Sequence, residues 1–97
     1  MKYVLEIKEE AVFDIKEAYL YYEEQRIGLG QRFLDTLETN LERVQKYPEH
    51  FQIRREPYRE AFIKDFPFLI IYEIEVPKII VYAIFNSCKN PNKKPIK

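Results

Sequence analysis

The side chains that could bind a charged ligand are mostly basic and lie in the second half of this chain. Residues 1–50 hold seven basic and eleven acidic residues, a net charge of −4, whereas residues 51–97 hold nine and five, a net charge of +4. As a group these cations could form a patch for an acidic segment of another protein, although a single exposed Lys or Arg is most often solvated surface charge. The basic candidates are Arg54, Arg55, Arg59, Lys64, Lys89, Lys93 and Lys94.

The other residue types that often do chemistry stand alone in this sequence. His50 is the only histidine, and we expect no metal site because zinc needs three or four converging ligands. Cys88 is the only cysteine, which excludes an internal disulfide and favours a reducing compartment, by default the cytoplasm. Tyr72 and Tyr82 could supply a phenol to a site, but tyrosine in a strand usually packs. We expect no cofactor.

Length and composition predict a single folded domain over residues 1–97. Hydrophobic residues make up 46% of the chain and charged residues 33%, which suffices for both a core and a soluble surface. The formal net charge of zero disfavours a general nucleic-acid-binding protein. Residues 1–8 alternate like a strand and carry charges where a signal peptide needs an apolar run, so we expect no membrane association.

Hydrophobic periodicity predicts a strand, then two helices, then several strands. A helix over residues 9–25 has apolar residues at spacings of three and four, and a second helix over residues 31–46 repeats the pattern after a break that holds both glycines. The expected buried faces are Val12, Ile15, Tyr19 and Tyr22 in the first helix, and Phe33, Leu37, Leu41 and Val44 in the second. The helices should therefore form an antiparallel hairpin.

The rest of the chain reads as strands over residues 51–56, 58–64, 68–75 and 78–86, with the first two separated by Pro57. Residues 91–97 hold two prolines and three lysines, and we expect them to be loosely held. The predicted fold class is α+β: an N-terminal strand and an antiparallel helical hairpin packed on one face of a mainly antiparallel sheet of four or five strands.

Alternation along the last two strands predicts two apolar sheet faces. One face should hold Ile70, Tyr72 and Ile74, and the other Leu69 and Ile71; in the last strand, Val81, Ala83 and Phe85 should oppose Ile80, Tyr82 and Ile84. Two helices can cover only one of these faces. We therefore expect the other face to be exposed and to bind a protein partner or a second copy of the chain.

Three segments and their order resemble the RelE/ParE toxins of type II toxin–antitoxin systems, also called plasmid stabilisation proteins. They are residues 58–62 (YREAF), 66–74 (FPFLIIYEI) and 80–91 (IVYAIFNSCKNP), which follow the helical hairpin. The resemblance implies a small bacterial toxin that a cognate antitoxin neutralises by wrapping over it, in a toxin–antitoxin hetero-oligomer. RelE-like members cleave messenger RNA on the ribosome, whereas ParE-like members bind DNA gyrase and are not nucleases.

The sequence departs from the RelE-like pattern where ribonuclease chemistry needs cations and acid–base groups. Leu69 stands where that pattern has an arginine, and Asn86 to Lys89 replace a histidine followed by arginines. We therefore favour a ParE-like toxin that acts by protein binding and is not an enzyme. The alternatives are a messenger RNA interferase, that is an endoribonuclease, with an atypical site, and a family member that is no longer toxic.

Candidate residues follow from these alternatives. The atypical catalytic site would use Arg59, Lys64, Tyr82 and Lys89. The expected partner-binding residues are Arg54, Arg55, Arg59, Lys64, Leu69, Ile71, Tyr82, Lys89, Lys93 and Lys94. Arg59 is the best single candidate because it matches an arginine of the family pattern, although it could equally anchor its strand through a salt bridge.

Overall fold

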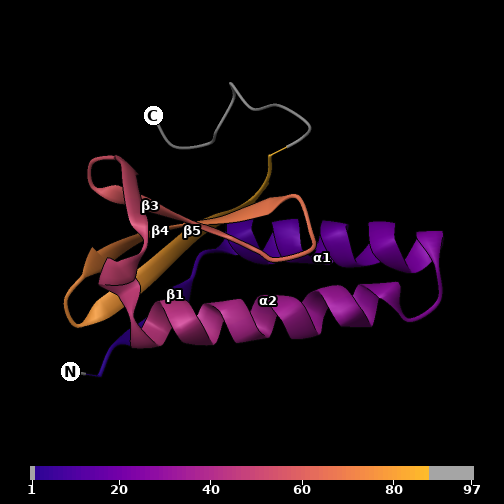
Figure 1. The fold of residues 1–97 in the computed structure, drawn as a ribbon, viewed down its shortest axis with the longest axis horizontal. Coiled ribbons are helices and arrows are strands. Elements are labelled where there is room, and N and C mark those ends of the chain that lie inside the picture. The colour runs from indigo at the N-terminus through magenta and orange to yellow at the C-terminus, as the bar shows by residue number, and fades with distance from the viewer. Residues whose placement is uncertain (1, 88–97) are drawn as a thin grey trace.

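The fold is a helical hairpin on one face of a five-stranded sheet, as a computed structural model of the chain describes it for residues 2–87 (Figure 1). The elements are β1 (Val4–Ile7), α1 (Glu9–Gln25), α2 (Leu29–Lys46), a 3-10 turn η1 (Pro48–His50), β2 (Gln52–Arg55), β3 (Tyr58–Phe62), β4 (Phe68–Glu75) and β5 (Lys78–Asn86). The predicted fold class is confirmed, and α1, β4 and β5 have the predicted bounds. Neither helix in this part of the chain is both long enough and apolar enough to cross a membrane.

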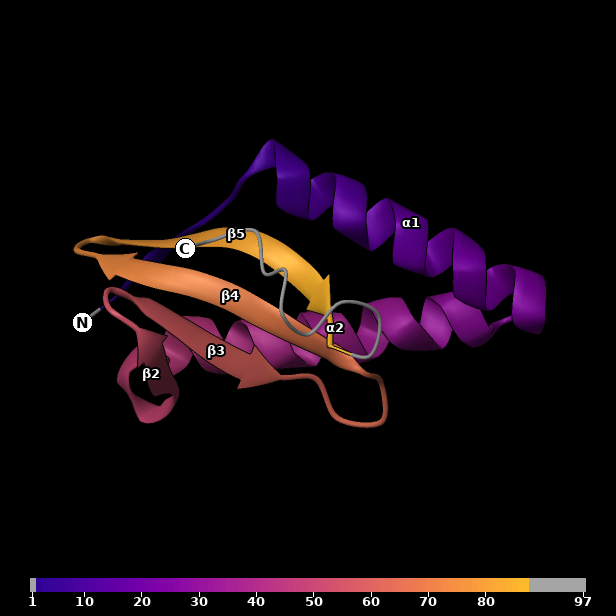
Figure 2. The same ribbon diagram turned by 90° about the horizontal axis from the view of Figure 1, so that it is seen from above.

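The sheet joins the first strand of the chain to the last one. The strand order is β1-β5-β4-β3-β2, in which β1 is parallel to β5 and every other pair is antiparallel. Figure 2 shows β5, β4 and β3 side by side, with β2 at the far edge of the sheet. The two helices therefore carry the chain from β1 at one edge of the sheet to β2 at the other edge, and β3, β4 and β5 then return it strand by strand to β1.

The main core lies between the helices and the sheet face that we call the inner face. Its strand side chains include Ile70, Tyr72, Ile79 and Val81, each fully buried. The helices contribute Phe33, Leu37 and Val44 from α2 and Ala11 and Ala18 from α1. The predicted face of α2 is thus confirmed. The predicted face of α1 is wrong at Val12, which is 39% exposed, because α1 buries its two alanines instead.

A β-bulge in β5 changes which side chains share a face. Ile71 pairs with Ala83 but Tyr72 pairs with Val81, so Tyr82 is an extra residue in β5. Beyond it the alternation is reversed: Ala83 packs in a second cluster on the opposite face, which we call the outer face, while Val81 packs in the main core. The expected grouping of Val81 with Ala83 is therefore wrong.

A carboxylate joins the two helices at their connection. Glu23 accepts hydrogen bonds from the backbone N–H groups of Gly28 and Gly30, each at 3.0 Å. Gly28 adopts a φ of +91°, which favours glycine, and Gly30 lies so close to α1 that a Cβ there would sit 2.7 Å from the Tyr19 carbonyl oxygen. Because Glu23 satisfies N–H groups at the start of α2, the helix begins two residues earlier than predicted.

Candidate protein-interaction site

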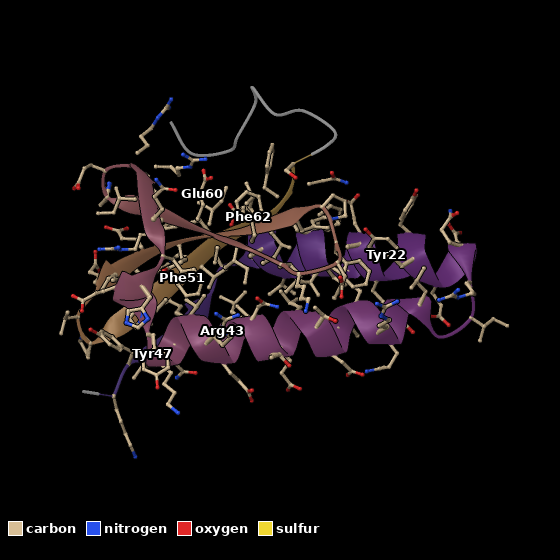
Figure 3. The ribbon with its side chains drawn as sticks, viewed as in Figure 1. Tyr22, Arg43, Tyr47, Phe51, Glu60 and Phe62 are labelled. Atoms are coloured by element: carbon tan, nitrogen blue, oxygen red, sulfur yellow. The ribbon has the colours of Figure 1, made fainter. Side chains whose placement is uncertain are left out.

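The outer face of the sheet consists of three cross-strand rows of side chains from β3, β4 and β5. From the end of β5 inward, the rows are Phe62, Leu69 and Phe85; then Glu60, Ile71 and Ala83; then Tyr58, Glu73 and Ile80. Figure 3 shows Glu60 and Phe62 on the side of β3 that faces away from α2, opposite to Phe51 and Arg43. This face is the sheet surface that the helical hairpin leaves without a helix.

The apolar centre of the outer face is buried, contrary to expectation. Leu69 is 3% exposed and Ile71 is 2% exposed, and both belong to a small cluster with Ala83. Tyr58 and Phe85 from the neighbouring strands pack against this cluster, which shields its sides. The expectation of an open apolar face is therefore wrong for Leu69 and Ile71 in this conformation. Phe62, by contrast, is 65% exposed.

Tyr82 and Glu73 form a polar pair on the outer face. The Tyr82 hydroxyl donates a hydrogen bond of 2.7 Å to a Glu73 carboxylate oxygen, and its ring meets the Tyr58 ring edge-on at 5.5 Å. The hydrogen bond to Glu73, together with burial, raises the pKa of the Tyr82 phenol. Tyr82 is thus held protonated and oriented by its neighbour, which suits a hydrogen-bonding role and not that of a general base.

The arginines of β2 lie at the exposed edge of the sheet. All four residues of β2 are exposed, and within residues 2–87 no further strand pairs with the outer side of β2. Arg54 forms an ion pair of 3.7 Å with Glu60, whose side chain is only 8% exposed. Arg55 is exposed at the end of the strand. This edge therefore offers backbone hydrogen-bonding groups and two guanidinium groups to a partner.

Arg59 points to the opposite side of the sheet and holds a turn. It pairs across the sheet with Tyr72 of the main core, and its guanidinium donates to the carbonyl oxygens of Phe51, at 2.7 Å, and Glu49, at 3.4 Å. The Tyr72 hydroxyl donates to the Pro48 carbonyl oxygen at 2.5 Å, and burial raises the pKa of that phenol. Together these two side chains attach the segment after α2 to the sheet. The alternative of an anchoring role for Arg59 thus has support, although the hydrogen bonds of its guanidinium go to backbone carbonyl oxygens and not to a carboxylate.

The proposed catalytic residues do not come together in the described part of the chain. Arg59 faces the inner side, Tyr82 belongs to the outer face, and Lys64 is exposed in the turn between β3 and β4. Lys89, Lys93 and Lys94 lie outside the described residues. Across residues 2–87, no group of three or more His, Cys, Asp or Glu side chains is placed to hold a metal ion.

The site includes acidic residues that the sequence reasoning missed. Glu60 and Glu73 flank the buried cluster of the outer face, where carboxylates would repel a phosphodiester. Alternation along β3 and β4 could have placed them there, since Glu60 shares a parity with Phe62 and Glu73 with Ile71. A second missed feature is the solvent side of α1, where Phe13 and Leu20 are each 60% exposed and two turns apart.

Comparisons with known proteins agree with this fold. A family model described as the ParE toxin of the type II toxin–antitoxin system parDE matches residues 5–90. A solved structure of a chromosomal ParDE toxin–antitoxin system from P. aeruginosa superposes with a TM-score of 0.79 at 12% identity, covering 88% of this chain and 96% of that one. A copper-bound mutant toxin from Helicobacter pylori gives a TM-score of 0.54 at 18% identity, with 89% and 94% covered. A comparison with curated protein sequences gave no match.

Proposed function

The chain belongs to the ParE toxin family of type II toxin–antitoxin systems, and we propose that it acts by binding another protein and not by cleaving RNA. The observation that carries the proposal is the separation of its candidate catalytic groups. A ribonuclease site needs a cation and an acid–base group within hydrogen-bond reach of one phosphodiester. Here the Arg59 guanidinium is committed to the Phe51 carbonyl on one face, and the Tyr82 phenol to Glu73 on the other.

The electrostatics of the outer face support the same proposal. Glu60 and Glu73 lie in two adjacent rows of this face, and Arg54 is already paired with Glu60. A polyanion such as messenger RNA would meet these carboxylates, which costs free energy unless further cations are supplied. A protein segment can instead match mixed charges residue by residue. DNA gyrase is the candidate cellular target.

The neutralising partner is proposed to be a cognate antitoxin that uses the β2 edge. An extended segment laid along β2 could pair with its free backbone groups, and acidic side chains on that segment would meet Arg54 and Arg55. The structure from P. aeruginosa is of a ParDE toxin–antitoxin system, which is the kind of assembly proposed for this chain. Lys64, Lys89, Lys93 and Lys94 stay candidates for further contacts.

Induced expression in a bacterial host tests the proposal. Growth arrest with filamentous cells, intact transcripts and inhibition of gyrase supercoiling by the purified protein is expected. Arrest with cleaved transcripts would contradict protein binding and support an endoribonuclease, whereas unaffected growth would indicate a family member that has lost toxicity. Co-expression of the reading frame beside the gene should restore growth if it encodes the antitoxin.

A pair of variants tests the role of the β2 edge. Arg54→Gln combined with Arg55→Gln is expected to raise the dissociation constant for the antitoxin by about tenfold, which corresponds to about 1.4 kcal/mol. The matched control is Arg26→Gln combined with Arg43→Gln, which removes two arginines from the helical layer. An equal loss of affinity in both double variants would show a general effect of charge and not a site at β2.

A further inference from the structure

The two helices of the hairpin differ on their solvent sides. Among the described residues, every large apolar side chain of α2 is buried or half-buried, as expected for a helix at the surface of a domain. α1 instead exposes four of its large apolar side chains: Val12, Phe13, Leu20 and Tyr21. Phe13 and Leu20 are each 60% exposed. Because α1 has apolar residues on two sides and the sheet covers only one, its other side is left for a partner.

A row of carboxylates runs beside the exposed apolar row of α1. Phe13 and Leu20 are seven residues apart, and exposed glutamates repeat at the same spacing: Glu10, Glu17 and Glu24. Seven residues are nearly two helical turns, so each set forms one row along the helix. The two rows are neighbours, because Glu17 comes four residues after Phe13 and three before Leu20. We call the surface made by these five residues the α1 surface.

The negative charge of the α1 surface is not neutralised within the described part of the chain. None of its three glutamates belongs to an ion pair there. The whole of α1 holds six acidic residues and one lysine, a net charge of −5. Burial raises the pKa of the adjacent Asp14, and the charges of Glu17 and Glu10 raise it further. The helix therefore presents an unpaired negative potential beside its apolar row.

A second copy of the chain is a poor match for the α1 surface. If two copies packed these surfaces in parallel and in register, each glutamate would meet the same glutamate of the other copy. In the antiparallel arrangement that places Phe13 opposite Leu20, Glu9 would lie opposite Glu24 at both ends. Like charges in these positions destabilise a helix pair. The glutamate row therefore selects a partner that is cationic.

We propose that the α1 surface binds a cationic amphipathic helix of another protein, whose apolar residues pack on Phe13 and Leu20 while its lysines or arginines face the glutamate row. The row from Glu10 to Glu24 is about 21 Å long, so a partner helix of about four turns covers it. Its cations should recur every seven residues beside its apolar residues, since charges beside an apolar row decide which helices pair.

The α1 surface is separate from the β2 edge. α1 packs against β5, next to β1, whereas β2 is the strand at the other edge of the sheet (Figure 2). Two proteins, or two segments of one protein, can therefore bind at these places at the same time. The proposal concerns the chemistry of a second binding surface and does not depend on whether the chain is toxic.

Titration of the purified full-length protein with two labelled synthetic helices tests the proposal. Each peptide has about 18 residues with one row of leucines, and the row beside it holds lysines in the first peptide and glutamates in the second. Fluorescence anisotropy is expected to show that the lysine peptide binds at least about tenfold more tightly than the glutamate peptide. Circular dichroism checks that each variant of the protein is folded.

Charge variants test the glutamate row. Glu17→Gln combined with Glu24→Gln is expected to weaken binding of the lysine peptide by about fivefold, because exposed ion pairs contribute modestly. The matched control is Glu38→Gln combined with Glu42→Gln, which removes the same charge from exposed positions of α2 and should change binding by less than about twofold.

Apolar variants test the other row. Phe13→Ser combined with Leu20→Ser is expected to weaken binding of the lysine peptide by about tenfold or more, because the apolar contact is lost. Val76→Ser is the matched control: Val76 is also 60% exposed, but it lies in the turn between β4 and β5 and should not affect binding.

Four results would each overturn the proposal. They are no binding of the lysine peptide, equal binding of both peptides, and equal effects of the α1 and α2 charge variants, which would indicate general attraction between opposite charges. The fourth is a dimer in analytical ultracentrifugation that Phe13→Ser combined with Leu20→Ser abolishes, because the α1 surface would then bind a second copy of the chain.

Discussion

Replacing Arg59 tests whether this residue stabilises the fold or contacts the target of the protein. Arg59 is the residue that matches an arginine of the family pattern. In Arg59→Met the long aliphatic chain is kept, but the guanidinium that donates to the Phe51 carbonyl at 2.7 Å is lost. A hydrogen bond from a charged donor contributes about 1.5–3 kcal/mol, and because Arg59 is half-buried we expect the lower part of this range, about 1.5–2 kcal/mol. The contact to Glu49 at 3.4 Å is long and adds little.

The assay is unfolding in urea followed by far-ultraviolet circular dichroism, with thermal unfolding as a second measure. For a domain of this size, a loss of 1.5–2 kcal/mol corresponds to a fall of about 6–16 °C in the melting temperature. Arg55→Met is the matched control: it removes an exposed arginine from the neighbouring strand and should change the free energy of unfolding by less than about 0.5 kcal/mol.

Growth inhibition decides the interpretation. If Arg59 only anchors the turn after α2, Arg59→Met should still arrest growth at a temperature where the variant is folded, in proportion to the amount of folded protein. A variant with the stability of the wild type that no longer arrests growth would refute this reasoning, because it would show that the guanidinium contacts the target.

Three further substitutions test other parts of the structure. Tyr72→Phe leaves the carbonyl of the buried Pro48 without its hydroxyl donor and should lower the free energy of unfolding in urea by about 1–3 kcal/mol. Gly30→Ala should lower the free energy of unfolding, measured by thermal unfolding, by about 1–2 kcal/mol, because the overlap of the new Cβ with the Tyr19 carbonyl oxygen outweighs the better helix propensity of alanine. Burial raises the pKa of Asp14, which accepts a 3.1 Å bond from the Ile84 N–H, so folding disfavours its ionised form and stability falls as pH rises through its titration range. Asp14→Asn should therefore be more favourable to stability at pH 7 than at pH 4 in parallel urea titrations, and an equal effect at both would contradict this assignment.

The element bounds could be predicted wherever a strong local signal marks them. The bounds of α1, β4 and β5 follow from apolar periodicity between residues that interrupt it, such as Pro67 and Pro77. The start of α2 could not be predicted, because glycine usually marks the end of a helix. Gly30 lies inside α2 because its N–H donates to the Glu23 carboxylate and because the helix approaches Tyr19 closely at this position.

The site was less predictable because it depends on pairing between strands. Strict alternation places Tyr82 and Ile84 together, but the bulge in β5 separates them, and a bulge is decided by the partner strand and not by local sequence. The direction of Arg59 likewise depends on which sheet face received the helices. Alternation along each strand could have placed Glu60 and Glu73 on one face of the sheet. That they lie close together follows only from the pairing of β3 with β4.

The pairing of β1 with β5 has a consequence for how the protein is made. During synthesis the N-terminal strand and the helical hairpin leave the ribosome before residues 78–86, so β1 has no strand to pair with, and the main core lacks Ile79 and Val81, until β5 emerges. A nascent chain that stops before β5 would lack the partner strand of β1 and part of its core, and it would be open to proteolysis. The protein can therefore complete its sheet only after β5 has been synthesised.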